Sequence, residues 1–149
     1  MSETTSQQLV VFSLGAEEYA LPIAAVHEII RFSEPRSVAS EVAWIRGVIG
    51  LRGKIIPIFD LAARLELAAT GREPGKIVIL ETGGGQVGVM VDEVEEVLTV
   101  DPEQLEPVPT ANVDTIDAIA KIDDRLVILL NPEGLFAATP AADELPVAA

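Results

Sequence analysis

The stretch RGVIGLRGKIIPIFDL, residues 46–61, decides the fold of this 149-residue chain. Two apolar runs rich in β-branched residues flank the polar turn GLRGK, in which Gly50 and Gly53 can supply the reversal that a β-hairpin needs. The same order of elements returns 71 positions later in DAIAKIDDRLVILLNP, residues 117–132. The stretch therefore predicts a hairpin that occurs twice.

The rest of the chain repeats with an offset of 68. LVVFSL (9–14) and the run 19–23 form one predicted hairpin, and IVILET (77–82) with VGVMV (87–91) form the other. Glu28 then aligns with Glu96. Two similar offsets that preserve the order of elements indicate an internal duplication. Chance matching of short β-rich runs is the alternative.

Short helical segments are predicted between the hairpins. Val26, Ile29 and Ile30 have helical spacing in AAVHEII, which predicts one or two amphipathic turns that end before Pro35. DEVEEVL, residues 92–98, shows the same spacing. A last short helix is expected near residues 133–136.

The fold class expected is mainly β, because each copy holds about five short strands. Five short strands hide their edges best by curling into a small barrel. We therefore expect two packed five-stranded barrels with a groove between them, from copies at roughly 9–68 and 76–136, with exchange of strands left open. Residues 1–8 are expected to be disordered and residues 137–149 mobile.

Composition limits the class of protein. Hydrophobic residues make up 49% of the chain, with mean hydropathy +0.38, as expected of a folded domain. No apolar run approaches the ~20 residues of a membrane span, and the first residues lack the features of a signal peptide. The chain has no cysteine, which excludes disulfides and thiolate metal sites. A cytoplasmic protein is expected.

The net charge of −14 is unevenly distributed. Residues 1–75 carry seven basic and nine acidic side chains, whereas residues 76–149 carry three and fifteen. A field of this sign repels phosphate backbones, so nucleic acid is not an expected partner. A basic protein surface fits better, and a solvated acidic face is the simpler explanation for most of the carboxylates.

The hairpin at 46–61 concentrates positive charge. Arg46, Arg52 and Lys54 are three of the ten basic residues in the chain. In the second copy, Asp123 and Asp124 stand where the first has Arg52 and Gly53. Since a turn needed only for folding would tolerate the same residues in both copies, this reversal predicts a contact surface on the first hairpin.

Enzyme chemistry has little support in the sequence. His27 is the single histidine, and a boundary histidine explains it better than a catalytic role. The cluster Asp92, Glu93, Glu95 and Glu96 lacks the ordered ligands and turn glycine of a calcium loop, so a solvated acidic face is the simpler interpretation. The glycines at 83–85 lie inside a hairpin and indicate a turn, not a phosphate site. No enzyme, metal or cofactor is predicted.

Two further residues leave alternatives open. Pro57 belongs on an edge strand or at a bulge, where it either marks a docking edge or blocks unwanted pairing. Trp44 suits a core or an interface, and we favour the core.

Four segments occur in order from residue 9 to residue 136: LVVFSLGAEEYALPIAAVHEI, WIRGVIGLRGKIIPIFDL, KIVILETGGGQVGVMVDEVEEVL and IDDRLVILLNPEGLF. In these segments the sequence resembles the CheW-like family of bacterial chemotaxis coupling proteins. The resemblance implies two SH3-like barrels and a non-catalytic adaptor. It implies as partners the cytoplasmic tip of a chemoreceptor, in the groove, and the regulatory domain of the histidine kinase CheA, on exposed barrel faces. Other CheW-like domains are further candidate partners, and recruitment to membrane-associated receptor arrays is expected.

The resemblance also implies positions for the binding site. Val26 and Glu28 match the V-x-E-I segment of the family, and Arg52 matches the arginine of its LRG turn. Glu28 and Arg52 can pair with each other or with partner groups. The residues predicted to bind receptor or kinase are Val26, Glu28, Ile29, Ile30, Arg46, Val48 and Arg52.

The sequence departs from the family at Gly50, where an asparagine is common, and around residues 30–32 and 117–122. These departures affect the partner surface and the pathway, not the fold. The alternative functions are an adaptor for a chemosensory system that controls pili or another output, a carboxylate metal-binding protein, and an oligomer that ignores kinase and receptor.

Overall fold

The structure is a computed structural model that describes residues 6–37, 44–65, 74–82, 85–107 and 115–135. The strands are β1 (Gln7–Leu14), β2 (Glu17–Pro22), β3 (Val26–Arg31), β4 (Ile45–Leu51), β5 (Lys54–Asp60), β6 (Lys76–Thr82), β7 (Gly85–Val91), β8 (Glu93–Val100), β9 (Leu105–Glu106), β10 (Ile116–Ile122) and β11 (Arg125–Leu130). The helical segments are η1 (Ile23–Ala25), α1 (Leu61–Arg64), η2 (Pro102–Gln104) and α2 (Pro132–Leu135). Within the described segments, no helix is long and apolar enough to span a membrane.

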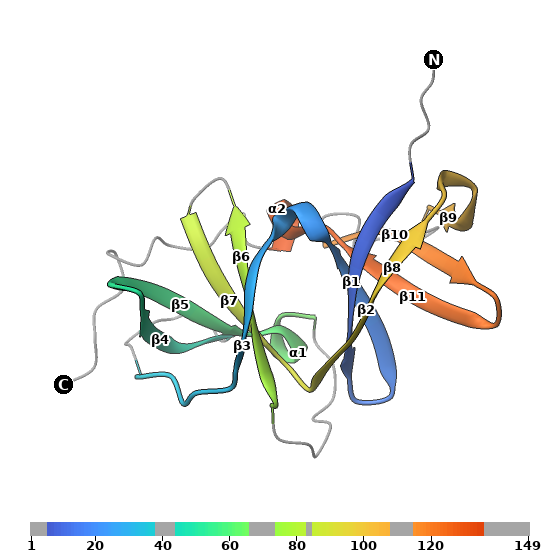
Figure 1. The fold of residues 1–149 in the computed structure, drawn as a ribbon. Helices are drawn as coiled ribbons and strands as arrows, with labels where there is room; N and C mark the ends of the chain where they lie inside the picture. The colour runs from blue at the N-terminus through green and yellow to red at the C-terminus, as the bar shows by residue number, and fades with distance from the viewer. Residues whose placement is uncertain (1–5, 38–43, 66–73, 83–84, 108–114, 136–149) are drawn as a thin grey trace.

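The strands form two sheets that lie side by side (Figure 1). One has the order β8-β1-β2-β11-β10-β9 and the other β3-β6-β7-β5-β4. The offsets of 68 and 71 convert the second order into the first, strand by strand, except for the additional β9. The prediction of a mainly β fold with two strand assemblies is confirmed, and the first sheet has six strands instead of five.

The two sheets also share their register. The pairs β1–β2 and β6–β7 have the same partners after a shift of 68, and β4–β5 matches β10–β11 after a shift of 71. Each edge strand has a β-bulge at the equivalent place, at His27 in β3 and at Glu95 in β8. Chance similarity does not reproduce registers and bulges, so the internal duplication is confirmed.

Each sheet curls until its two edges meet. After β3 the chain reaches Arg36, which forms a bridge with Val48 of β4 through two backbone hydrogen bonds of 2.8 Å. After β8 the chain passes through η2 into β9, where Glu106 pairs with Ile119 of β10. Ile119 is the equivalent of Val48. We call the sheet that contains β1 barrel A and the sheet that contains β4 barrel B.

Each barrel takes strands from both sequence copies. Barrel A combines β1 and β2 with β8 to β11, and barrel B combines β3 to β5 with β6 and β7. Two parallel pairs, β2–β11 and β5–β7, join the copies. The division of the sequence at 9–68 and 76–136 is therefore not the division into barrels.

Three apolar clusters explain the continuous hydrophobic runs. In β1, Leu9 and Val11 face the interior of barrel A, whereas Phe12 and Leu14 face the other barrel. In β6, Ile77 and Ile79 face the interior of barrel B, whereas Val78 and Leu80 face the other barrel. A strand buried on both faces needs apolar residues at every position, which removes the alternation typical of exposed sheets. The inter-barrel core consists of Phe12, Leu14, Tyr19, Leu21, Phe59, Leu61, Val78, Leu80, Val87, Val89, Val91, Leu130 and Leu135.

The predicted helix at Val26–Ile30 is wrong. These residues form β3, which pairs with β6, and η1 supplies a single helical turn just before it. Ile29 points outward and Ile30 packs against the interior of barrel B, as expected for period-two alternation. DEVEEVL is also a strand, within β8. Ile29 is an apolar residue at an exposed position of the strand, and together with Ile30 it gave the spacing of three and four from Val26 that looked helical.

Two other expectations need correction. Pro57 lies on β5, which is between β7 and β4, so it is on an interior strand and not on an edge. It faces Val48, whose N–H and C=O are bonded to Arg36, so Pro57 leaves no ladder hydrogen bond unmade there. Gln7 and Gln8 belong to β1, so the disordered N-terminus predicted at 1–8 is wrong at these positions. Residues 83–84 of the glycine turn and the tail 137–149 lie outside the described residues.

Candidate partner-binding site

An ion pair joins the edge strand β3 to the tip of the β4–β5 hairpin. Arg52 Nε donates to Glu28 Oε1 at 3.1 Å, and Arg52 Nη2 donates to Glu28 Oε2 at 2.8 Å. Both donors of the guanidinium fork face the carboxylate, which fixes the geometry of the pair. Of the two roles predicted for these charges, pairing with each other is present in the structure. The pair also spans the closure of barrel B.

The local backbone holds Arg52 at an unusual angle. Arg52 has φ 53° and Gly53 has φ 81°, which is the two-residue hairpin turn with positive φ at both positions. An arginine rarely adopts positive φ, because its Cβ then approaches the following carbonyl oxygen. Asp123 has φ 54° in the equivalent turn of barrel A. The turn geometry therefore belongs to the fold, whereas the side chain at its first position differs between the barrels.

The ion pair shifts the pKa values of both groups. The hydrogen bonds from Arg52 lower the pKa of Glu28, and the hydrogen bonds to Glu28 raise the pKa of Arg52. The Arg52 side chain is 70% exposed and that of Glu28 is 21% exposed. Exposed ion pairs stabilise folded proteins little, because water and salt screen them. The geometry is thus better suited to presenting two oriented charges than to stabilising the barrel.

His27 sits beside this pair. Its Nδ1 lies 3.5 Å from Glu81 and its Nε2 lies 3.8 Å from Glu28, and the side chain is exposed. His27 is the extra residue of the bulge, so it is skipped in the register between β3 and β6. The described residues contain no group of three potential metal ligands among their histidines and carboxylates. His27 is therefore an exposed histidine at the edge of barrel B, beside two carboxylates.

The other predicted site residues fall into two groups. Ile29 is 40% exposed, and Arg46 is exposed with its Nη1 3.5 Å from Asp60 Oδ2. Val26 is half-buried against the inter-barrel core, and Ile30 is half-buried against the interior of barrel B. Val48 is only 7% exposed and sits where the barrel closes, so it does not face a groove as expected.

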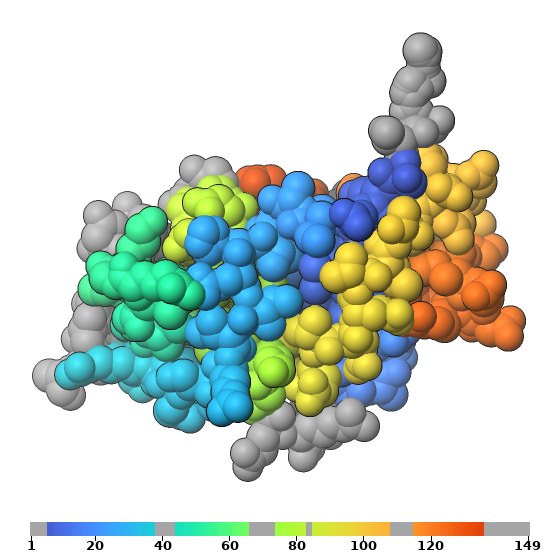
Figure 2. Space-filling view, viewed as in Figure 1, coloured from blue at the N-terminus to red at the C-terminus, as the bar shows by residue number. Residues whose placement is uncertain are grey.

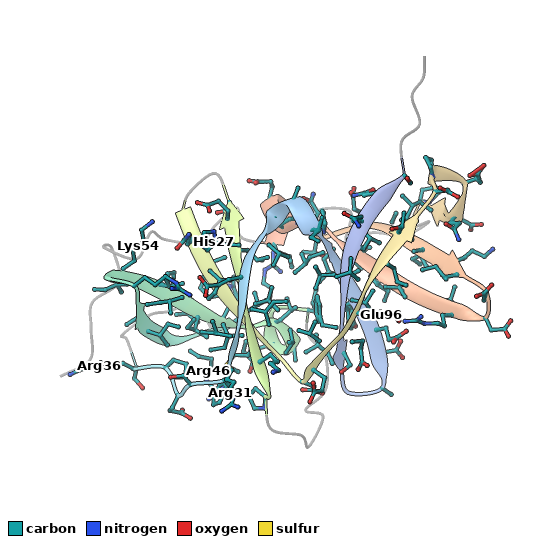
Figure 3. All side chains as sticks on the ribbon, in the orientation of Figure 1. His27, Arg31, Arg36, Arg46, Lys54 and Glu96 are labelled. Carbon is teal, nitrogen blue, oxygen red and sulfur yellow. The ribbon has the colours of Figure 1, made fainter. Side chains whose placement is uncertain are left out.

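The cationic hairpin has two separate ends. Arg46 is the second residue of β4 and Arg52 follows the last residue of that strand, so the two stand about 20 Å apart along the strand. Figure 3 places Lys54 and His27 near one end of barrel B and Arg31, Arg36 and Arg46 near the other. The positive charges noted in the sequence therefore belong to two surfaces.

Barrel A carries a counterpart that was not predicted. Arg125 Nη2 lies 2.8 Å from Glu96, which is the equivalent of Glu28, and its Nε lies 3.0 Å from Glu18. The hydrogen bonds that Arg125 donates to Glu18 and Glu96 raise the pKa of Arg125. The offset of 68 between Glu28 and Glu96 was the signal that could have found it.

Exposed apolar side chains also occur in equivalent pairs. Ile55 on β5 and Leu126 on β11 are each 61% exposed and are related by the offset of 71. Ile29 on β3 and Val97 on β8 are 40% and 51% exposed and are related by the offset of 68. The strands β3 and β8 occupy the centre of the face in Figure 2. Each barrel therefore combines an edge glutamate in an ion pair with two exposed apolar residues.

Charge is reversed between equivalent positions. The offset of 71 relates Arg46 to Asp117 and Arg52 to Asp123. Arg36 and Glu106 are also equivalent, because Arg36 pairs with Val48 where barrel B closes and Glu106 pairs with Ile119, the equivalent of Val48, where barrel A closes. Barrel A is strongly acidic as a result, whereas barrel B is not. The charges at these equivalent positions are therefore electrostatically complementary between the two barrels.

The acidic cluster of β8 has structural roles in part. Asp92 Oδ2 accepts a hydrogen bond of 2.7 Å from the backbone N–H of Gly15, and Asp92 N donates to Ser13 O. These bonds tie the β1–β2 turn to the β7–β8 connection. Glu96 belongs to the ion pair with Arg125, and Glu93 and Glu95 are exposed. The solvated acidic face predicted here describes Glu93, Glu95 and the exposed, ion-paired Glu96, but not Asp92.

Comparisons with known proteins agree with this arrangement. A family model described as "CheW-like domain" matches residues 8–139. The chain belongs to the CheW-like family. It is similar to a "Chemotaxis protein CheW" from Klebsiella aerogenes, with 32% identity over 145 residues, 94% of this chain and 87% of that protein. It is also similar to the crystal structure of the scaffolding protein TtCheW from Thermoanaerobacter tengcongensis, with TM-score 0.84, 33% identity and 96% of each chain covered.

A more distant relative has a different name. "Protein PilI" from Pseudomonas aeruginosa is 29% identical over 85 residues, which is 56% of this chain and 47% of that protein. The similarity to the Klebsiella aerogenes protein is longer and has a higher identity.

Proposed function

We propose that this chain is a non-catalytic adaptor that couples the cytoplasmic tip of a chemoreceptor to the regulatory domain of the histidine kinase CheA. The observation that carries the proposal is the match to the CheW-like family over nearly the whole chain, with relatives named as chemotaxis and scaffolding proteins. The exposed, oriented Glu28–Arg52 pair supplies a site suited to binding.

The contact residues divide by exposure. Glu28, Ile29, Arg46 and Arg52 contact a partner directly, because their side chains reach solvent. Val26, Ile30 and Val48 hold the shape of β3 and of the barrel closure beneath them. Interfaces of this kind combine a few apolar anchors with charged groups that orient the partner.

Other CheW-like barrels are proposed as further partners. The arginines of barrel B fit a barrel that has carboxylates at the equivalent positions, as barrel A has. Such a contact joins unlike surfaces head to tail, so it can extend from one copy to the next. It weakens with salt, because most of these charges are exposed.

The proposal is tested by titration calorimetry against the regulatory domain of the kinase from the same organism. We expect saturable binding that Arg52→Glu and Glu28→Arg each weaken at least about tenfold, and that the exchange Glu28→Arg with Arg52→Glu partly restores. Lys54→Glu is the matched control, since it makes the same charge change two residues from Arg52, and Lys54 has no ion pair among the described residues.

If Lys54→Glu weakens binding as much as Arg52→Glu, net charge and not the oriented pair is responsible. If none of the variants affects saturable binding, the site assignment fails and the adaptor function stands. If the folded chain does not bind the domain at all, the adaptor function fails.

A second candidate function is an adaptor for a chemosensory system that controls pili, which the similarity to PilI favours. The same titration with the kinase domains of each chemosensory system in the organism separates the two. A cytoplasmic location at receptor arrays is part of the proposal. A fluorescent fusion that forms polar or lateral clusters only when receptors are present would support it.

A further inference from the structure

The exit helices α1 and α2 meet between the barrels through Arg64. Arg64 Nε donates to Leu135 O at 2.9 Å, and Nη2 lies 3.5 Å from Gly134 O. The offset of 71 relates Arg64 to Leu135, so the bond joins equivalent positions of the two copies. The contact therefore lies where the duplicated halves face each other, and α2 packs against β6 of barrel B.

Trp44 completes this contact. The guanidinium of Arg64 lies 4.8 Å from the centroid of the Trp44 ring, a cation–π distance. Trp44 packs against the inter-barrel core, and its indole Nε1 is buried without a hydrogen-bond partner among the described residues. Thr115 stands at the equivalent position of the other copy, so the stack exists in one copy only.

Asp60 links α1 to the surface. Its Oδ1 accepts the N–H of Ala63 and so caps α1, its backbone N–H donates to Trp44 O at 2.7 Å, and its Oδ2 lies 3.5 Å from Arg46. Leu61 and Leu135 are buried in the inter-barrel core beside these groups. An exposed arginine is thus connected to α2 of the other barrel in three steps: Asp60, α1 and Arg64.

We propose that Arg64 is a clamp that fixes the two barrels relative to each other and transmits changes at Arg46 to α2. Arg46 holds one oxygen of Asp60 while the other caps α1. A change in the contacts of Arg46 alters the cap, and the cap positions α1 and therefore Arg64. Because Arg64 bonds the carbonyl oxygens of α2, the end of α2 responds.

The clamp is tested in the isolated chain by a double-mutant cycle of Arg46→Gln and Arg64→Gln. The readouts are the fluorescence of Trp44, the only tryptophan, and exchange of the Leu135 amide, which donates to Asn131 O. Arg64→Gln should speed Leu135 exchange about tenfold, as for loss of a charge-assisted hydrogen bond, and red-shift the Trp44 emission. The Asp92 amide, bonded to Ser13 O, should not change.

The coupling is the decisive result. Arg46→Gln should speed Leu135 exchange about two- to fivefold, the range for a weak ion pair, and should have no effect once Arg64 is glutamine. Equal effects of Arg46→Gln in both backgrounds, or no effect in either, overturn the proposal. If Arg64→Gln does not unfold cooperatively, Arg64→Lys replaces it, because lysine keeps the charge and loses the fork. Since no partner is needed, failure here is distinguishable from failure of the proposed function.

Discussion

The closure of barrel B depends on Gly47, which gives a quantitative prediction. A Cβ on Gly47 would lie 2.1 Å from Arg36 O, a backbone atom that cannot move aside without opening the bridge to Val48. Opening it breaks two backbone hydrogen bonds of 2.8 Å, each with a net contribution of about 0.5–1.5 kcal/mol. We therefore expect Gly47→Ala to lower the free energy of unfolding by about 1–3 kcal/mol. For a chain of this size, that loss lowers Tm by roughly 2–12 °C.

Gly50→Ala on the same strand is the matched control. A Cβ on Gly50 would meet nothing within 4 Å, and its φ is outside the region reserved for glycine. We expect no loss of stability, or a gain of about 0.4–1 kcal/mol from a less flexible unfolded chain. Equilibrium urea unfolding measures both variants, and exchange of the Val48 amide locates the effect. If Gly47→Ala is no less stable than Gly50→Ala, or the Val48 amide keeps its protection, the bridge does not close the barrel.

Two further predictions concern the interior of barrel B and its ion pair. A Cβ on Gly88 would lie 2.6 Å from Ile58 Cδ1, so Gly88→Ala should lower the free energy of unfolding by about 1–3 kcal/mol. The loss should be smaller in an Ile58→Val background, which lacks that methyl group. Equal losses in both backgrounds, measured by urea unfolding, would refute this. The hydrogen bonds from Arg52 lower the pKa of Glu28 in the folded chain. The stability that this pair contributes is therefore fully present above the ordinary carboxyl pKa, and it is lost as the pH falls through the lowered pKa of the folded state. Arg52→Gln should raise that pKa in an NMR titration of the Glu28 carboxyl group, and an unchanged midpoint would show that the pair does not persist in solution.

The sequence was sufficient for the strands of the hairpins, because burial leaves a strong pattern in them. The repeated apolar runs gave the hairpins and the duplication, and Gly53 with its polar neighbour marked the turn that holds Arg52. The charges of Glu28 and Arg52 were also noted as capable of pairing. These features depend on local chemistry or on comparison of the chain with itself.

The helix expected at Val26–Ile30 shows where local pattern fails. A bulge at His27 inserts one residue, so Val26 packs against the inter-barrel core whereas Ile30 packs against the interior of barrel B. A run of six residues is too short for its spacing to separate a bulged strand from a helix. Pairing with β6, more than forty residues away, decides the conformation.

The burial of Val48 and the exchange of strands between the two barrels could not be predicted from any single segment of the sequence. Both follow from closure of the barrels, which depends on Arg36 meeting β4 and on parallel pairing between the copies. The charge reversal of Arg36 and Glu106 was hidden for the same reason. They are equivalent through their bridges, and neither repeat offset connects them directly.

Simultaneous binding is the property that defines an adaptor, and sedimentation velocity measures it. The samples are this chain, the kinase regulatory domain and a receptor cytoplasmic hairpin, alone, in pairs and together. We expect both binary complexes and a ternary complex that sediments faster than either, with Arg52→Glu reducing the ternary species. Two binary complexes that exclude each other, or no complex with either partner, would contradict it.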